Sequence, residues 1–329
     1  MRKGQPEANM TDRLPREIIV NILSLLPLTS LLNSKLVCRA WRTLIQDPFL
    51  IRKHLDEAAG NDPSFVLESI RTIPDQRYFI DFFDHSEGKM ISKKLPGFPT
   101  TMHLVDSCDG LLCLHDTSRT VFICNPFTRV YVKLRKPVKC PTVVQILTIG
   151  TPFWRNLGTV PYHFYPSRSK TFVNGRFHWL SRPNKYTKAS LLISFDLETE
   201  QFQEVTKADC CCASDMCFRQ LTVVRGCPSA GAFHGDDERS EIWVIKEYGV
   251  KESWIKEFTI GTYLPPTLIA QREIRQLRYS NPNLLVQVLC VLKSGEILLE
   301  FLSSALVLYD PQYETFKELG FWKCVIASK

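Results

Sequence analysis

The chain has 329 residues, of which 44% are hydrophobic and 23% are charged, and these proportions are typical of a folded globular protein. The net charge of +7 is spread evenly, with nine basic and six acidic residues in positions 1–60 and 32 and 28 in the remainder, which argues against a dedicated nucleic-acid-binding protein. No apolar run approaches the roughly 20 residues that span a bilayer, and the polar N-terminus lacks the apolar core of a secretory signal. We therefore expect a cytoplasmic or nuclear protein that contacts no membrane and keeps most of its twelve cysteines as small, reduced, buried thiols.

Residues 1–10 are polar, and we expect them to be disordered, whereas residues 11–60 predict a small helical domain. Thr11 or Asp12 can cap the first helix, Pro15 suits its first position, and Pro27 ends it. Apolar residues of this helix cover an arc of roughly 160°, wider than the roughly 100° that one packed face needs. A second helix is expected from about residue 29 and a third from about residue 36. Since so short a unit cannot bury this apolar surface by itself, we predict that the surplus face is an interface.

The residue order in this region resembles the F-box motif over roughly residues 12 to 52. The residues that we expect to form this adaptor-binding unit are Leu14, Pro15, Ile18, Ile22, Leu23, Leu26, Pro27, Leu31, Val37, Cys38 and Trp41. The resemblance implies docking onto the Skp-type adaptor of an SCF ubiquitin ligase and, through it, onto cullin and RING subunits. Some of these residues must hold the helices together while others face the adaptor, and the sequence does not divide the two groups.

Asp47-Pro48 predicts a capped fourth helix that Gly60 can end, and we place the domain boundary near residue 60. The remainder, residues 61–329, shows short β-like runs separated by turn residues. We expect strands at 64–69, 77–83, 110–115, 120–124, 143–149, 171–180, 191–196, 241–246, 253–260, 284–292, 297–301 and 305–309. Short strands at close spacing indicate an all-β sandwich, barrel or propeller.

An internal repeat favours the propeller. Residues 124–134, 195–205 and 309–319 align without gaps, each with Asn or Asp at the second position, an aromatic at the eighth and an aliphatic residue at the eleventh. The Asn or Asp side chain can hold a turn by bonding its own backbone, so each segment predicts a hairpin, and residues 242–260 have the same outline. Repeated hairpins over about 270 residues predict a β-propeller of about six blades.

This half of the chain also looks like the kelch-like F-box-associated domain of plant F-box proteins. The matching segments lie between about residues 100 and 319 and include Asp109–Cys113, Ile123–Pro126, Val173–Leu180, Ser194–Leu197, Glu241–Val244 and Ser253–Lys256. In that family the domain receives the target protein, and its motif residues are structural. The resemblance therefore implies no catalytic residue.

The groups that could carry chemistry are few. Residues 210–212 are cysteines, and Cys217 and Cys227 follow, but no C-x₂-C pair is present, so we predict no metal and no cofactor. His178 is expected to be a packed residue in a hairpin, and no catalytic or nucleotide-binding motif is found. A basic run could receive an acidic or phosphorylated target, the alternative being a solvated outer strand; it consists of Arg129, Lys133, Arg135, Lys136 and Lys139.

These patterns together predict a non-catalytic adaptor that presents a target protein to a ubiquitin ligase for proteasomal degradation. Two other hypotheses stay open at this point. The β domain could bind a small molecule or act as an enzyme, with the F-box only regulating the turnover of the protein itself. Alternatively, the chain could be an interaction module that works outside the ligase.

Overall fold

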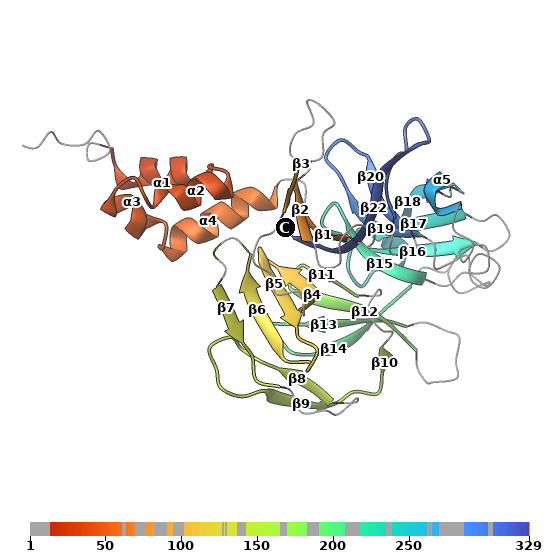
Figure 1. Cartoon of the computed structure of the whole chain (residues 1–329). Helices are drawn as coiled ribbons and strands as arrows, with labels where there is room; N and C mark the ends of the chain where they lie inside the picture. Colours follow the sequence, from red (N-terminus) through yellow and green to blue (C-terminus); the bar gives the residue numbers. More distant parts are fainter. Residues whose placement is uncertain are drawn as a thin grey trace, which may run out of the picture.

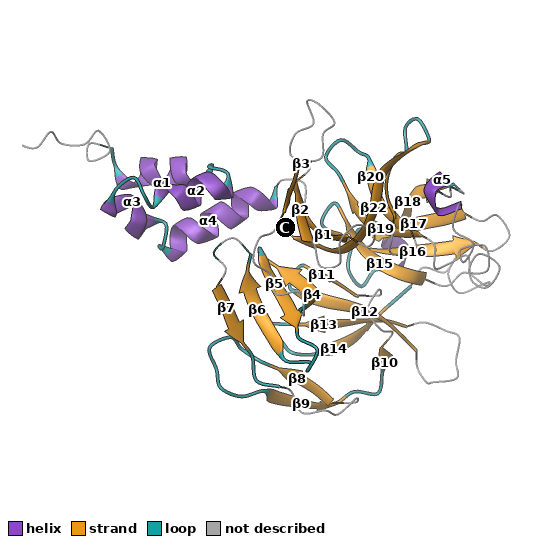
Figure 2. Cartoon of the chain, in the orientation of Figure 1, coloured by secondary structure: helices purple, strands orange, loops and turns teal. Residues whose placement is uncertain are grey.

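Helices occupy the first part of the chain and strands most of the rest, as Figures 1 and 2 show. The structure is a computed structural model. It describes residues 14–60, 64–69, 77–81, 91–94, 102–126, 128, 130–136, 143–164, 170–182, 191–207, 218–234, 239–261, 263, 265–269, 286–301 and 305–328. The expected disorder of residues 1–10 and the possible cap residues Thr11 and Asp12 lie outside these ranges. Within the described residues, no helix is long and apolar enough to cross a membrane.

Four helices form the N-terminal unit: α1 (Arg16–Ser24), α2 (Leu28–Ser34), α3 (Arg39–Leu44) and α4 (Pro48–Ala59). Their common core consists of Ile19, Val20, Leu23, Leu31 and Leu50, with four partly buried hydrophobic residues around it. The core joins α1 and α2 to α4, so the fourth helix completes the unit. Most of the stability of such short helices comes from this packing rather than from helix propensity.

The helix ends differ from the prediction at two places. Pro15 precedes α1 as its N-cap instead of occupying the first helical position. The third helix begins at Arg39 rather than near residue 36, because Cys38 has an extended backbone (φ −156°, ψ 170°) and its Sγ accepts a hydrogen bond from Trp41 N at 3.4 Å. The predicted cap of α4 is confirmed, since Asp47 Oδ1 accepts a 2.9 Å hydrogen bond from Phe49 N.

In the part of the chain that the structure describes, twenty-two strands follow. They are β1 (Ser64–Ser69), β2 (Arg77–Asp81), β3 (Ile91–Lys94), β4 (His103–Cys108), β5 (Leu111–His115), β6 (Val121–Asn125), β7 (Val130–Lys133), β8 (Val143–Ile146), β9 (Arg155–Thr159), β10 (His163–Phe164) and β11 (Lys170–Val173). The others are β12 (Arg176–Arg182), β13 (Leu191–Asp196), β14 (Phe202–Val205), β15 (Phe218–Val224), β16 (Cys227–His234), β17 (Arg239–Ile245), β18 (Trp254–Ile260), β19 (Val286–Val291), β20 (Ile297–Phe301), β21 (Ala305–Asp310) and β22 (Thr315–Ser328). The short helix α5 (Pro266–Ile269) lies between β18 and β19.

These strands form four large antiparallel sheets instead of the six blades that the sequence predicts. The sheets are β4–β7, β15–β18, a five-stranded sheet of β10 to β14, and a seven-stranded sheet ordered β19-β20-β21-β22-β1-β2-β3; β8 and β9 form a separate two-stranded ribbon. The number of sheets differs from the six-blade estimate because one long strand, β22, joins two four-stranded units into one sheet and because β8 and β9 form only a two-stranded ribbon. The mainly-β, propeller-like architecture is as expected.

Neighbouring sheets meet mainly through their first strands. β15 contacts β11 and β12 on one side and β19 on the other, while β22 contacts β4. Single polar contacts join the same neighbours: Trp254 Nε1 donates to Thr206 O (2.9 Å) and Val288 N donates to Gln220 Oε1 (3.1 Å). First strands that touch around a centre are the arrangement of a propeller.

The repeated hairpins predicted from the sequence are confirmed with a shared register. In each, the first residue of the repeat lies opposite the eighth: Cys124 opposite Tyr131, Phe195 opposite Phe202, and Tyr309 opposite Phe316. The Asn or Asp at the second position accepts backbone hydrogen bonds from its turn in all three hairpins. The repeat therefore encodes turn geometry and one cross-strand pair.

Sequence reasoning did not resolve several hairpins. The strand predicted at 171–180 is two strands, β11 and β12, because Asn174 and Gly175 both take positive φ values (51° and 73°) and close a two-residue turn. β15 and β16 are joined in the same way at Arg225 and Gly226 (48° and 76°). The strand predicted at 143–149 ends at Ile146.

Candidate functional site

Helix α1 carries two apolar faces. Ile19, Val20 and Leu23 are buried in the core. Ile18, Ile22 and Leu25, at positions i, i+4 and i+7, form an exposed stripe on a different face, with exposed fractions of 44%, 44% and 70%. This explains the wide apolar arc that the sequence predicts, because one part of the arc packs in the core and another part stays exposed.

The predicted adaptor-binding residues separate into three groups. Leu23 and Leu31 are buried in the helical core. Leu26, Cys38 and Trp41 are half-buried. The exposed group consists of Leu14, Pro15, Ile18, Ile22, Pro27 and Val37. Only the last two groups can touch a partner directly, so the buried pair would support an interface by holding the helices in place.

The turn between α2 and α3 exposes two further apolar residues. Leu36 and Val37 are 79% and 60% exposed, because the chain leaves α2 at Ser34 and does not become helical again until Arg39. Sequence reasoning placed Leu36 inside a helix and left both Leu36 and Leu25 out of the adaptor-binding set. We call the exposed residues Leu14, Ile18, Ile22, Leu25, Leu36 and Val37 the apolar F-box surface.

The charged residues on and beside the α2–α3 turn are all basic. The chain contains no Asp or Glu between Glu17 and Asp47, whereas Lys35, Arg39 and Arg42 lie on and beside the α2–α3 turn. Within the described residues, the Arg42 side chain donates to Lys35 O (3.2 Å), and Asp47 pairs with Arg16. The residues that follow α2 thus present apolar side chains among cations.

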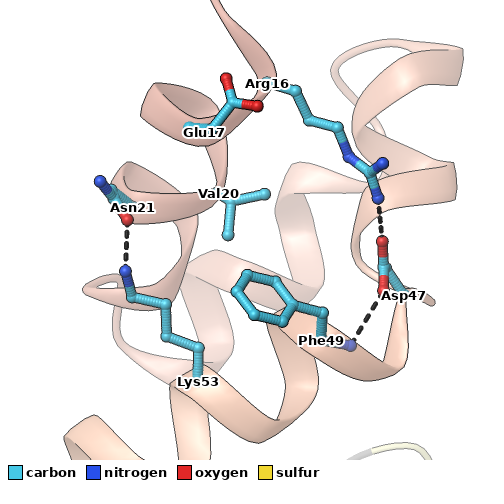
Figure 3. A pocket seen from close by; sticks show the side chains of 7 residues that line it. All are labelled: Arg16, Glu17, Val20, Asn21, Asp47, Phe49 and Lys53. Carbon is cyan, nitrogen blue, oxygen red and sulfur yellow. Dashed lines mark hydrogen bonds and ion pairs between the residues drawn. The ribbon is translucent and has the colours of Figure 1, made fainter.

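A hollow of about 500 Å³ lies on another side of the unit, between α1 and α4 (Figure 3). Arg16 pairs with Asp47 at one end, and Lys53 donates to Asn21 Oδ1 at the other. Val20 and Phe49 lie between these two contacts. None of the predicted adaptor-binding residues lines this hollow, and its polar contacts fix the angle between α1 and α4.

The basic run of the β domain is described only in part. Arg129 and Lys139 lie outside the described residues, whereas Lys133, Arg135 and Lys136 are exposed at the end of β7. Lys136 Nζ donates to Ser118 O (2.9 Å) in the turn between β5 and β6, which brings the exposed Arg119 to the same corner of the sheet. The sequence run missed Arg119, because only the strand pairing places it there.

The predicted packed state of His178 is borne out by its environment. The side chain is 1% exposed and its ring lies edge-on to Tyr248 at 5.7 Å. Burial lowers the pKa of His178 to about 4, and the charge of Arg176 contributes in the same direction. A histidine held neutral in this way serves packing between two sheets.

Few other groups could carry chemistry. Within the part of the chain that the structure describes, no group of three or more His, Cys, Asp or Glu side chains is placed to hold a metal ion. The cysteines at 210–212 and Cys217 lie outside the described residues, and Cys227 is half-buried and free. Burial raises the pKa of the Cys108, Cys113 and Cys124 thiols, so these three are held in the thiol form.

Comparison with known proteins supports both halves of this description. Residues 11–57 match the F-box-like family, and residues 133–291 match the F-box associated beta propeller domain. F-box protein At3g07870 of Arabidopsis thaliana is 32% identical over 94% of this chain and 88% of the relative. F-box/kelch-repeat protein At3g23880 of the same plant is 23% identical over 75% of this chain and 79% of the relative. The chain therefore belongs to the family of plant F-box proteins with a C-terminal F-box-associated domain.

Proposed function

We propose that this protein is the substrate-recognition subunit of an SCF-type ubiquitin ligase. The helical unit docks a Skp-type adaptor, which connects it to cullin and RING subunits, and the β domain holds a target protein for ubiquitination and proteasomal degradation. The observation that carries the proposal is the apolar F-box surface, which a four-helix unit leaves open while its own core is complete. Large exposed apolar patches on small domains mark protein interfaces.

The mechanism requires no catalytic group in this chain. A target held on the β domain is tethered to the ubiquitin-loaded enzyme of the ligase, and the tether raises the effective concentration of its lysines there. We therefore place the protein among non-catalytic subunits that need no cofactor and that work in the cytoplasm, the nucleus or both.

The test is co-purification of the full chain with a Skp-type adaptor. Ile22→Asp puts a charge in the centre of the exposed stripe without entering the core, so we expect adaptor affinity to fall about tenfold or more. A change at Leu23, which is fully buried, would be uninformative because it would unfold the unit. Ile149→Asp is the matched control, since Ile149 is 57% exposed in the loop between β8 and β9. Equal adaptor recovery by the wild type and Ile22→Asp would refute the proposal.

A further inference from the structure

Strand β7 is the free edge of its sheet within the described residues, because the order is β4-β5-β6-β7. Leu134 N donates to Val121 O at 2.8 Å, and the register places Val132 opposite Ile123 and Lys133 opposite Phe122. Bonded and non-bonded pairs alternate in antiparallel sheets. Lys133 therefore directs its backbone N–H and C=O away from β6, toward the outer edge.

The two faces of β7 differ in chemistry. Val130 and Val132 are 60% and 44% exposed on one face. Lys133 is exposed on the other face, which it shares with the half-buried Tyr131, because side chains alternate along a strand, and Arg135 and Lys136 follow it. A strand added to this edge would meet valines on one face, and Tyr131 with Lys133 and the cations that follow it at the other.

Few of these cations meet a negative charge within the described part of the chain. No ion pair there involves Arg119, Lys133, Arg135 or Lys136, although the Lys136 charge helps to lower the pKa of the nearby Asp116, whose Oδ1 accepts a 2.7 Å hydrogen bond from Thr120 N. Another outer strand, β18, shows the opposite situation. Its Glu257 pairs with Arg225 and Lys246, and its Lys256 pairs with Glu241.

We propose that the outer edge of β7 binds an extended acidic segment of the target protein by adding it to the sheet as a further strand. In this segment, acidic residues alternate with apolar ones, so that carboxylates face Lys133 and its neighbours while apolar side chains cover Val130 and Val132. Main-chain hydrogen bonds supply affinity in this mode of recognition, and the alternating side chains supply specificity. The inference rests on the proposed function, because it names the class of target segment that the β domain would hold.

The test uses the full chain and synthetic peptides of about eight residues, long enough to cover a strand. The first peptide alternates valine and glutamate. The second has the same composition in two blocks, and the third replaces glutamate by lysine. We expect the alternating acidic peptide to bind about tenfold or more tightly than either control, measured by fluorescence anisotropy, and to weaken as salt is added.

Variants at one position separate the backbone from the charge. Lys133→Ala removes the charge, whereas Lys133→Pro also removes the outward N–H and leaves the bonds to β6 in place. We expect Lys133→Pro to bind more weakly than Lys133→Ala. Lys317→Ala, a change at an exposed lysine of β22, should bind as the wild type does. The double change Arg119→Glu/Lys136→Glu leaves the β7 backbone intact and should also weaken binding.

Three results would overturn the inference: no binding of the alternating peptide, equal binding of the block peptide, or equal affinities of Lys133→Pro and Lys133→Ala. Thermal melting of each variant shows whether it is folded. Adaptor binding is scored in the same preparations. A wild-type chain that binds the adaptor but not the alternating peptide refutes the edge-strand site alone, whereas loss of adaptor binding in Ile22→Asp with intact peptide binding leaves that site standing.

Discussion

His178 is a titratable residue placed where its charged form is costly. Its ring is buried against Tyr248, and the Arg176 guanidinium lies 5.1 Å from the centre of the same tyrosine ring. Arg176 in turn pairs with Asp196 at 2.6 Å. Protonation of His178 would therefore put a second positive charge near Arg176 in a buried site.

This burial predicts a loss of stability in acid. The pKa of His178 falls from 6.5 to about 4 on folding, so the unfolded chain takes up the proton first. The neutral His178 contributes fully to the free energy of unfolding above pH 6.5. This contribution is lost as the pH falls toward 4, by up to about 1.4 kcal/mol per pH unit. Thermal melting between these pH values should show a shallower slope for His178→Phe. An unchanged slope would mean that other groups cause the acid sensitivity.

At Gly231 there is no space for a side chain. A Cβ at this position would lie 2.5 Å from Gln220 Cγ and 2.6 Å from its Nε2. Gln220 is buried, and its Oε1 accepts the hydrogen bond from Val288 N that joins β15 to β19. The absence of a side chain in β16 thus permits a contact between two sheets.

We expect Gly231→Ala to lower the free energy of unfolding by about 1–3 kcal/mol, because Gln220 must move and a buried N–H loses its acceptor. Gly261→Ala is the matched control, since nothing lies within 4 Å of a Cβ there. In chemical denaturation, the double variant Gln220→Ala/Gly231→Ala should lose less stability than the sum of the single variants. Strict additivity would show that the clash is not the cause.

At the scale of the element, the second and third of the repeated hairpins share one turn geometry. Asp310 Oδ1 accepts hydrogen bonds from Gln312 N (2.8 Å) and Tyr313 N (3.3 Å), and Glu314 then takes a positive φ of 54°. Asp196 and Glu200 repeat this arrangement between β13 and β14. Hydrogen bonds from the Thr199 and Glu198 backbone lower the pKa of Asp196, with a contribution from Arg176.

We expect Asp310→Ala to lower the free energy of unfolding by about 1–2 kcal/mol, because two backbone donors of the turn lose their acceptor. Asp310→Asn keeps the side-chain oxygen and should stay close to the wild type. A thermal melt of the three proteins is the measurement. Equal losses in both variants would assign the effect to charge instead of turn geometry.

What the sequence could predict follows the same division by scale. The cap at Asp47-Pro48 and the hairpin repeats could be predicted because capping and turn chemistry depend on neighbours in the chain. The division of α1 into a core face and an exposed face could not be predicted, since it depends on where α4 packs. Arg119 joined the basic corner only through strand pairing. The predicted number of blades differs from the observed number of sheets, because a strand that is shared by two units leaves no periodic signal in the sequence.

At the scale of the whole molecule, β22 joins the last strands to the first. Residues from Thr315 to Phe321 pair with β21, and residues from Trp322 to Ser328 pair with β1. Figure 1 shows the C-terminus beside β1, which follows directly on α4 and the short link after it. The pairing of β22 with β1 therefore joins the two ends of the β domain, close to the point where the chain passes from α4 into this domain.

Removal of residues 322–329 should open this closure. β1 would lose its partner on one side, and we expect limited proteolysis to cut the β domain much faster than in the full chain. The helical unit has its own core, so adaptor binding should persist in the truncated protein. Protease resistance equal to that of the full chain would show that β22 is not needed for closure.

The shared strand also has a consequence for synthesis. The helices can fold as soon as they leave the ribosome, whereas β1 has no inner neighbour until β22, made last, arrives to pair with it. If the helices dock as proposed, translation that ends early yields a protein whose β domain cannot hold a target. Its helices still occupy an adaptor. Such a product would compete with the intact protein for the adaptor. Faulty translation would therefore lower the rate of target ubiquitination by a larger fraction than the fraction of truncated copies.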